Sequence, residues 1–394
     1  MRESYYLAFR YLLFHRSRTL ILITCITLIA YIPSALQIIL KKSETQLKSR
    51  AIETDLILGS KGSSIDLVMN SLYFQKDVPD LIPMSALDDI YDTELATAIP
   101  LYVRFQARNH MIVGTSVDYF DYRQLQLHEG NLFSRLGDCI LGSSVANEFQ
   151  LGVGDYIVSS SENIFDITGV YPLKMKVTGI LKPSGTNDDD ALFVDVKTTW
   201  VIQGLVHGHQ DLAESTNESV ILERDSSNIS ANAKLYHYNE ITEDNLESFH
   251  FHGNFDDYPL SSILIIPDSE KSGTLLRGQY LLEDERLVQI VDPIKTVEEI
   301  LQNIFKIKKV IDRVIIFVAI STLLALILVF SLSMKLRAGE MSTYFKMGSS
   351  KNLILRLFLA EITLILTGSL ILNIILYYIT LFIANSNSSI LILN

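Results

Sequence analysis

The chain has 394 residues, of which 48% are hydrophobic and 20% charged, and its mean hydropathy is +0.26. This is more hydrophobic than a typical soluble protein, so part of the chain is expected to lie in a membrane. The formal net charge of −12 argues against nucleic acid as a partner, because surfaces that bind nucleic acid are basic.

Three uncharged segments have the length that a helix needs to cross a bilayer. They are residues 19–40, 314–334 and 362–384, with 22, 21 and 23 residues. Between the first two lie 273 mostly polar residues, whereas only 27 residues separate the second from the third. The sequence therefore predicts a membrane α-helical part with three spans, one large water-exposed domain and one short loop on the opposite side.

The distribution of basic residues predicts the orientation. Residues 1–18 carry a net charge of +3 and residues 335–356 one of +4, whereas residues 19–334 carry −18. Cytoplasmic segments that flank spans are enriched in Lys and Arg. The leader and the short loop are therefore expected in the cytoplasm, and the acidic domain in the periplasm, outside a cell inner (plasma) membrane. No small-x-small motif follows the first span, which is expected to stay uncleaved.

The elements before the β-rich part are predicted from composition and spacing. Residues 1–18 interleave aromatic residues with arginines, which on a helix gives a basic face and an apolar face suited to membrane lipid headgroups. Residues 41–52 are expected to continue the first span as a polar helix. Residues 55–62 favour a strand and turn, and residues 63–74 a helix.

Short strands separated by Gly, Asp and Asn are predicted from about residue 95 onward. They are residues 101–107, 111–116, 138–141, 156–159, 174–181, 191–196 and 262–267. Residues 145–149 favour a helix that ends at a glycine, and residues 210–233 a polar segment. Asp292 followed by Pro293 predicts the start of a helix that continues into the second span. The fold class is therefore membrane α-helical with a large α/β and β-rich extracytoplasmic domain.

Signals for catalysis are weak. The chain has no Gly-x-Ser-x-Gly, His-Glu-x-x-His or Walker A sequence, so it is not expected to be an enzyme or to bind ATP itself. No span carries a charge in its middle, which argues against an ion pathway. Cys25 lies in the first span and Cys139 in the domain, so no disulfide is expected between them. No cofactor is expected.

Two sets of side chains suggest metal ligands. His207 with His209, and His250 with His252, are His-x-His pairs, and a strand places both imidazoles of such a pair on one face. Together they could supply nitrogen ligands for Zn²⁺ or Cu²⁺, but simple surface histidines in polar surroundings are the favoured interpretation. Residues 188–190 are three consecutive aspartates that could bind Ca²⁺, but a solvated loop is the favoured interpretation.

The short loop between the second and third spans is the stronger functional candidate. A short helix over residues 340–347 is predicted to end at Gly348. Met341, Tyr344, Phe345 and Met347 give this helix an apolar surface on the cytoplasmic side. Packing against lipid headgroups would account for it, but docking into a cytoplasmic partner is preferred, because a plain basic flank needs no apolar surface.

The same loop resembles the coupling segment of the FtsX-like permease family, which includes macrolide-exporter and lipoprotein-release ABC systems. The matching residues are Arg337, Glu340, Phe345, Met347, Gly348, Ser349, Lys351, Ala360 and Glu361. In the outer domain, residues 55–62 (Asp-Leu-Ile-Leu-Gly-Ser-Lys-Gly), 117–120, 151–155, 177–186 and 193–194 also resemble that family. The resemblance covers most of the chain. The family usually has four spans, so three would mean a truncated sequence or a permease that works with three.

This resemblance implies a mechanotransmission permease, with a MacB-like periplasmic domain, that relays the motion of a separate ATPase to an envelope substrate. The ATPase-coupling residues would be Arg337, Glu340, Met341, Phe345, Met347, Gly348 and Lys351. The expected partners are a cytoplasmic ABC ATPase subunit, a second copy or paired permease, and a periplasmic or outer-membrane protein. The alternatives are an FtsX-like regulator of a cell-wall hydrolase, and a membrane-anchored metal-binding or sensor domain.

The predicted organisation has eight parts. They are a cytoplasmic amphipathic leader (1–18), span one (19–40), a periplasmic domain with a porter-like and a β-rich part (41–292), a helical stalk (293–313), span two (314–334), a cytoplasmic coupling loop (335–361), span three (362–384) and an outer tail (385–394).

Overall fold

The computed structural model describes residues 2–160, 172–208, 221–224, 229–231, 239–242, 245–246, 249–251, 253–282, 287–336, 339, 342–343, 346, 348 and 351–386. Chain contacts divide the molecule into two units. The first comprises Met1–Thr45 with Leu301–Asn394, and the second Gln46–Ile300. Both boundaries between them fall inside long helices.

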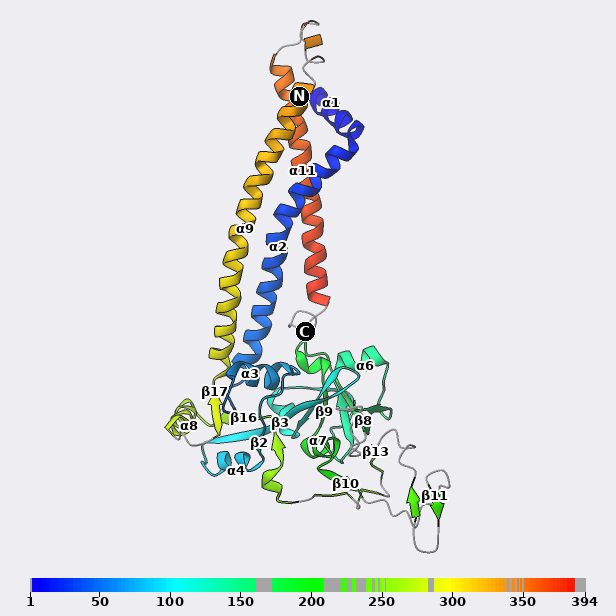
Figure 1. The fold of residues 1–394 in the computed structure, drawn as a ribbon, viewed down its shortest axis with the longest axis vertical. Coiled ribbons are helices and arrows are strands. Elements are labelled where there is room, and N and C mark those ends of the chain that lie inside the picture. Colours follow the sequence, from blue (N-terminus) through cyan, green and yellow to red (C-terminus); the bar gives the residue numbers. More distant parts are fainter. Residues whose placement is uncertain are drawn as a thin grey trace. The chain divides into compact units, whose positions relative to one another are not determined.

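The first unit is built from helices (Figure 1). They are α1 (Arg2–Phe14), α2 (Arg16–Ile52), α9 (Pro293–Leu336) and α11 (Lys351–Ser386), of which α2 and α9 continue into the second unit. Helix α1 packs against α11. Helices α2 and α11 share hydrogen bonds, because Thr27 Oγ1 donates to the carbonyl of Ser369 at 3.4 Å and the hydroxyls of Tyr31 and Thr380 lie 2.6 Å apart. Small and hydroxylated residues allow such close contact between apolar helices.

Among the described residues, two helices are long and apolar enough to cross a membrane, Arg16–Ile52 and Leu355–Ala384. They contain the first and third predicted spans. The second predicted span, residues 314–334, lies inside α9, where some side chains are outside the described part, so three spans remain a prediction. Pro33 lies within α2, and the helix continues past it to Ile52.

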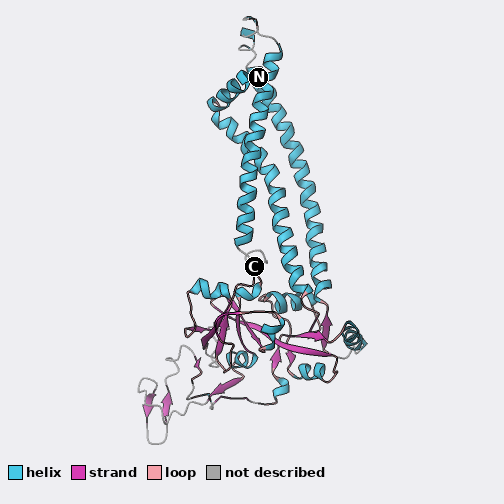
Figure 2. Cartoon of the chain, turned by 180° about the vertical axis from the view of Figure 1, so that it is seen from behind, coloured by secondary structure: helices cyan, strands magenta, loops and turns pink. Residues whose placement is uncertain are grey.

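The second unit contains a mixed sheet (Figure 2). Within the described residues the strand order is β13-β8-β6-β9-β4-β3-β16-β1-β17, and β5 and β7 also pair with β8. The pairs β4–β9, β6–β8 and β8–β13 are parallel and the remaining pairs of this sheet are antiparallel. The strands are β1 (Leu56–Ser60), β3 (Ala96–Ala107), β4 (His110–Thr115), β5 (Leu127–Gly130), β6 (Asp138–Leu141), β7 (Tyr156–Val158), β8 (Leu173–Leu181), β9 (Leu192–Asp195), β13 (Asn239–Glu240), β16 (Ser262–Pro267) and β17 (Val288–Val291).

Shorter elements surround this sheet. The helices are α3 (Ser64–Tyr73), α4 (Ser85–Tyr91), α5 (Asp118–Tyr122), α6 (Ser143–Phe149), α7 (Val196–Ile202) and α8 (Glu270–Leu282), with 3₁₀ turns η1 (Asn187–Asp190) and η3 (Phe255–Asp257). The other strands are β2 (Ile82–Pro83) with β15 (Pro259–Leu260), β10 (Val206–Gly208) with β14 (Phe249–Phe251), and β11 (Ile221–Arg224) with β12 (Ile229–Ala231).

At strand β1 both faces of the sheet are buried, because Leu56, Ile57 and Leu58 are all buried and successive side chains of a strand point to opposite faces. On one face, Leu56 and Leu58 of β1 join the main core with α4, α7 and α8. Its largest member is Trp200, whose Nε1 donates to the carbonyl of Pro259 at 2.9 Å. On the other face, Ile57 is fully buried and α3 approaches so closely that a Cβ at Gly59 would lie 2.3 Å from Leu67 Cδ1. The second face carries the candidate site.

Candidate functional site at the end of helix α2

The last turns of α2 have a buried stripe that contains an arginine. Leu47, Arg50, Ala51 and Thr54 follow helical spacing and are 5%, 4%, 1% and 1% exposed, whereas Ile52 is 63% exposed. Such a stripe is the side that a helix packs against its own domain. Here the packing places the Arg50 guanidinium inside the second unit.

Arg50 forms a two-pronged ion pair with Asp188. Its Nη1 lies 2.6 Å from Oδ2, and its Nη2 lies 2.8 Å from Oδ1. Tyr119 completes the arrangement, because its hydroxyl donates to Asp188 Oδ1 at 2.7 Å and accepts from Arg50 Nη2 at 2.7 Å. Arg50 Nε also donates to the carbonyl of Leu72 at 3.3 Å. Paired Arg–carboxylate hydrogen bonds fix orientation as well as distance.

Local turns hold Asp188 in place. Thr186 is the N-cap of η1, and its hydroxyl donates to Asp188 Oδ2 at 2.7 Å. The neighbouring Asp189 accepts from the backbone N–H of Ser184 at 2.8 Å and of Gly185 at 2.7 Å. The prediction of a solvated acidic loop is wrong at these two aspartates, because Asp188 is fully buried and Asp189 is 5% exposed. Asp188 is satisfied by Arg50 and two hydroxyls rather than by a metal ion.

Further side chains bind the carbonyls at the end of α2. The hydroxyl of Tyr73 donates to the carbonyl of Leu47, and that of Tyr122 to the carbonyl of Glu53 at 2.8 Å. Arg123 Nη1 also donates to the carbonyl of Glu53, at 3.4 Å. The carbonyl of Glu53 lies just past the last residue of the helix, where carbonyls have no partner within the helix and carry partial negative charge, so Tyr122 and Arg123 stabilise this end of α2.

Burial and pairing act in opposite directions on the charges. Burial alone would raise the pKa of Asp188, but the adjacent Arg50 and its hydrogen bonds hold that pKa below the usual value. For Arg50, burial would lower the pKa, and the contact with Asp188 raises it above its ordinary value. Burial raises the pKa of Tyr119. All three groups therefore keep their usual forms at neutral pH: an aspartate, a guanidinium and a neutral phenol.

The arrangement joins a helix to a domain and is unsuited to proton transfer. Its ionisable groups are buried, and their pKa values are moved away from neutrality, whereas acid–base catalysts are tuned toward it. Its components come from α2, α5 and the turn before β9, which are far apart in the sequence. We call Arg50, Asp188 and Tyr119 the α2 anchor.

Most residues predicted to couple to an ATPase lie outside the described part of the chain. These are Arg337, Glu340, Met341, Phe345 and Met347. Gly348 forms a turn with φ of +86°, and Lys351 is the first residue of α11. A positive φ favours glycine, and a turn fits the predicted end of a short helix at this position. The coupling role of all seven residues stays a prediction.

The structure places one member of each histidine pair. His207 of β10 and His250 of β14 are directly opposite in an antiparallel register, whereas His209 and His252 lie outside the described residues. In that described part, no group of three or more His, Cys, Asp or Glu side chains is arranged to hold a metal ion. The four-histidine metal site therefore remains untested.

The α2 anchor was missed at the level of sequence. The composition of residues 41–52 predicts only a polar helix, although Leu47, Arg50 and Ala51 carry the spacing of a buried stripe. An arginine on such a stripe requires a buried acidic partner. The sequence offers many aspartates and does not identify which one is used.

The chain was compared with known families and structures. A family model described as the MacB-like periplasmic core domain matches residues 19–233, more than half of the chain. The chain therefore belongs to the family of proteins with a MacB-like periplasmic core domain. This confirms the family relationship predicted from the loop and domain motifs. No match was found among curated proteins.

The comparison with solved structures found extracytoplasmic parts of transporters. The extracellular domain of the noncanonic ABC-type transporter YknZ from Gram-positive bacteria is 11% identical, with a TM-score of 0.34 over 60% of this chain and 98% of that one. The periplasmic region of MacB from Actinobacillus actinomycetemcomitans is 13% identical, with a TM-score of 0.34 over 64% and 93%. A domain of a putative permease from Porphyromonas gingivalis is 11% identical, with a TM-score of 0.27 over 60% and 86%.

Proposed function

We propose that this chain is the permease subunit of an ABC transporter complex, in which it relays ATPase-driven motion to an extracytoplasmic domain that acts on an envelope substrate. The MacB-like core domain supports membership of such a complex. The spans and the distribution of basic residues support an inner-membrane location with the large domain in the periplasm. ATP hydrolysis is assigned to a separate cytoplasmic subunit, and the permease works as a dimer or as one of a pair.

The observation that carries this proposal is the α2 anchor. Helix α2 contains an apolar segment long enough to cross a membrane and continues to Ile52. Two residues before its end, Arg50 is locked to the interior of the second unit. A helix that ended in a flexible linker would absorb movement, whereas one fixed by buried, oriented hydrogen bonds transmits it to the domain. This favours a relay over a passive anchor.

Helix α9 is the second helix that runs from one unit into the other, and its first residues make contacts within the second unit. Helix α9 begins at Pro293, and Asp292 just before it lies 3.1 Å from Arg277 Nη1 and 3.4 Å from Lys295 Nζ. Within the second unit, Thr296 is 5% exposed and Val297 is fully buried. Helix α9 thus starts as part of the folded second unit, as a stalk that transmits movement would require.

The relay is tested by hydrogen exchange in the complex of the full chain with its ATPase. In the wild type, ATP should change amide exchange in the second unit. Arg50→Lys keeps the charge but loses the two-pronged geometry. It should leave ATP hydrolysis intact and remove most of this ATP-dependent change. Lys271→Arg, at an exposed position of α8, is the control. A response of unchanged size in Arg50→Lys would contradict the relay.

A metal-binding role for the domain is the second candidate, because the register places His207 opposite His250. Titration of Zn²⁺ into the full chain, with His209→Ala as a comparison, tests it. Saturable binding that the substitution weakens would support this candidate. Identical titrations for both proteins would dismiss it.

A further inference from the structure

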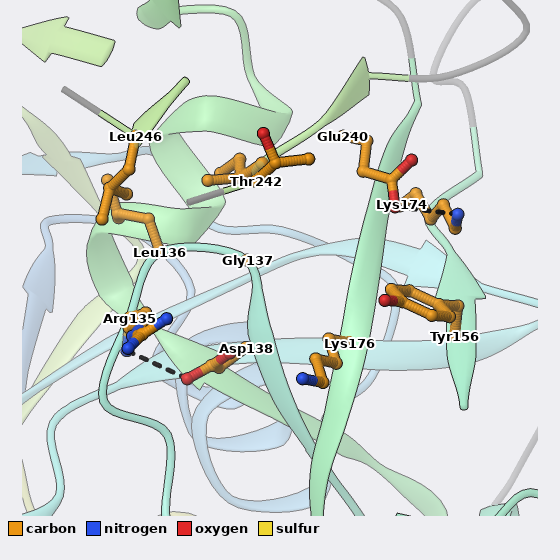
Figure 3. A pocket seen from close by; sticks show the side chains of 11 residues that line it. Arg135, Leu136, Gly137, Asp138, Tyr156, Lys174, Lys176, Glu240, Thr242 and Leu246 are labelled. Atoms are coloured by element: carbon orange, nitrogen blue, oxygen red, sulfur yellow. Dashed lines mark hydrogen bonds and ion pairs between the residues drawn. The ribbon is translucent and has the colours of Figure 1, made fainter. Parts of the chain in front are cut away.

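A polar pocket of about 270 Å³ lies beside strand β8 and shares no residue with the α2 anchor (Figure 3). Its walls come from the loop before β6, from β7 and β8, and from the segment that follows β13. The side chains that matter for its chemistry are Asp138, Tyr156, Lys174, Lys176, Glu240 and Thr242.

Strand pairing fixes a row of side chains across this pocket. Lys176 of β8 is directly opposite Asp138 of β6 on one side and Tyr156 of β7 on the other. Residues that are opposite in a sheet share a face. The chain neighbours of Lys176, Met175 and Val177, point into the core and are fully buried. Because side chains alternate along β8, Lys176 lies on the exposed face of the sheet.

Of the charged side chains in this pocket, Lys174 and Asp138 have partners in the described structure, whereas Lys176 does not. Lys174 is engaged, because its Nζ lies 2.8 Å from Glu240 Oε1 and 4.2 Å from the ring centroid of Tyr156. Asp138 Oδ2 accepts the backbone N–H groups of Ser134 and Arg135 at 3.1 and 3.0 Å. Lys176 is exposed, and among the described residues its ammonium has neither a hydrogen bond nor an ion pair. Lys176 thus contributes an available cation to the wall of the pocket, in a segment (residues 19–334) whose net charge is −18.

We propose that this pocket binds an acidic carbohydrate, a hydroxylated ring that bears a carboxylate or phosphate group. The anionic group pairs with the Lys176 ammonium. The ring hydroxyls bond to the hydroxyls of Tyr156 and Thr242 and to Glu240, whose carboxylate has acceptor sites beyond the one used by Lys174. The volume lies below the range of about 300–1,000 Å³ for drug-sized ligands, which fits a single sugar unit. The proposal does not depend on the transporter function.

The test is calorimetric titration of the purified full chain with glucuronate and with glucose 6-phosphate. Glucose and inorganic phosphate are the matched probes for the ring alone and the anion alone. At least one acidic sugar should bind saturably and more tightly than both matched probes. Lys176→Gln should weaken that binding at least about tenfold, because a charge-assisted hydrogen bond is lost. Lys176→Arg should retain it, and Lys271→Gln, which removes one charge from exposed α8, should not change it.

Several results would overturn the proposal. One is the absence of saturable binding by either acidic sugar. Another is equal binding in the wild type and Lys176→Gln. Phosphate or glucose binding as tightly as the acidic sugars would show that the pocket does not recognise the combined chemistry. Lys176 is exposed, so its substitution leaves the core packing intact, and unchanged thermal unfolding of Lys176→Gln confirms that lost binding is not lost folding.

Discussion

Arg50 is a charge that water does not reach, and one carboxylate compensates it. Removing two charges from water costs several kcal/mol per ion, so a buried pair adds little stability over an apolar pair of the same shape. Its value lies in specificity, because the paired hydrogen bonds accept a single orientation of α2 against the domain. Arg123 lies in the same region, and within the described residues its Nε and Nη2 are buried without a hydrogen-bond partner. Burial and the nearby Arg50 lower the pKa of Arg123.

Asp188→Asn should destabilise the domain strongly. The change removes the countercharge and leaves the buried Arg50 unpaired, which costs about 3–5 kcal/mol. Urea unfolding followed by near-ultraviolet circular dichroism measures the loss. Asp121→Asn, at an exposed position of helix α5, is the control and should stay within about 0.5 kcal/mol of the wild type. Equal stability of the two variants would contradict the structural role of the pair.

The α2 anchor should also give the protein a component of acid sensitivity. The pKa of Asp188 is lowered in the folded state, so the unfolded chain takes up a proton at higher pH than the folded one. The stability from this group is therefore complete above the unfolded pKa of about 3.9 and decreases as the pH falls toward the folded pKa.

The double variant Arg50→Met with Asp188→Leu removes this component while filling the same space. The free energy of unfolding, measured against pH, should fall less steeply below about pH 4 in the double variant than in the wild type. Parallel curves would show that Asp188 does not titrate as its surroundings indicate.

At the scale of elements, the sequence predicts the positions of several strands well, but it does not predict which strands pair in the sheet. Residues 262–267 form β16 as predicted, and β8 begins one residue earlier than predicted. Strand β3 begins at Ala96 rather than at residue 101, and it contains Pro100, a residue that strands usually exclude. Pro100 is tolerated because pairing with β4 begins only at Leu101. Helix α6 ends at Phe149, and the residue that caps it in a left-handed conformation is Gln150, with φ of 52°, and not a glycine.

What the sequence could not supply is contact between distant segments. Helical spacing marks Arg50 as buried, but Asp188 is 138 positions away and has acidic neighbours with other roles. The choice depends on how Thr186 and the following turn direct one aspartate inward. Pairing of β7, β8 and β13 around Lys176 is likewise a property of the sheet order and not of local composition.

Gly142→Ala should disturb the turn that carries Asp188. A Cβ at Gly142 would lie 2.3 Å from the carbonyl oxygen of Asp188 and 2.4 Å from that of Asp189. Both are backbone atoms, so the turn must move, and overpacking of this kind costs about 1–3 kcal/mol. Urea unfolding measures the effect. Gly278→Ala is the control, because nothing lies within 4 Å of its Cβ. An unchanged free energy of unfolding in Gly142→Ala would mean that the turn adapts without losing the ion pair.

At the scale of the whole molecule, the proposed relay needs a docking surface for the ATPase as well as an anchored helix. Phe345→Glu and Met347→Glu each place a charge on the predicted apolar surface of the coupling loop. Each should abolish copurification with the ATPase while leaving membrane insertion unchanged, because burying an unpaired carboxylate in an interface is costly. Ser342→Glu is the control, since Ser342 is exposed and outside that surface. Undiminished recovery of the ATPase with both variants would rule out this docking surface.

Trp200 gives the intact protein a built-in optical reporter. It is the only tryptophan of the 394 residues, and it is fully buried in the main core of the second unit. The rings of Tyr258 and Phe255 lie 4.6 and 5.4 Å from it. Indole emission from the purified full chain therefore originates entirely from the second unit. The emission wavelength therefore reports whether the second unit is folded, without a dye and without background from the helices of the first unit.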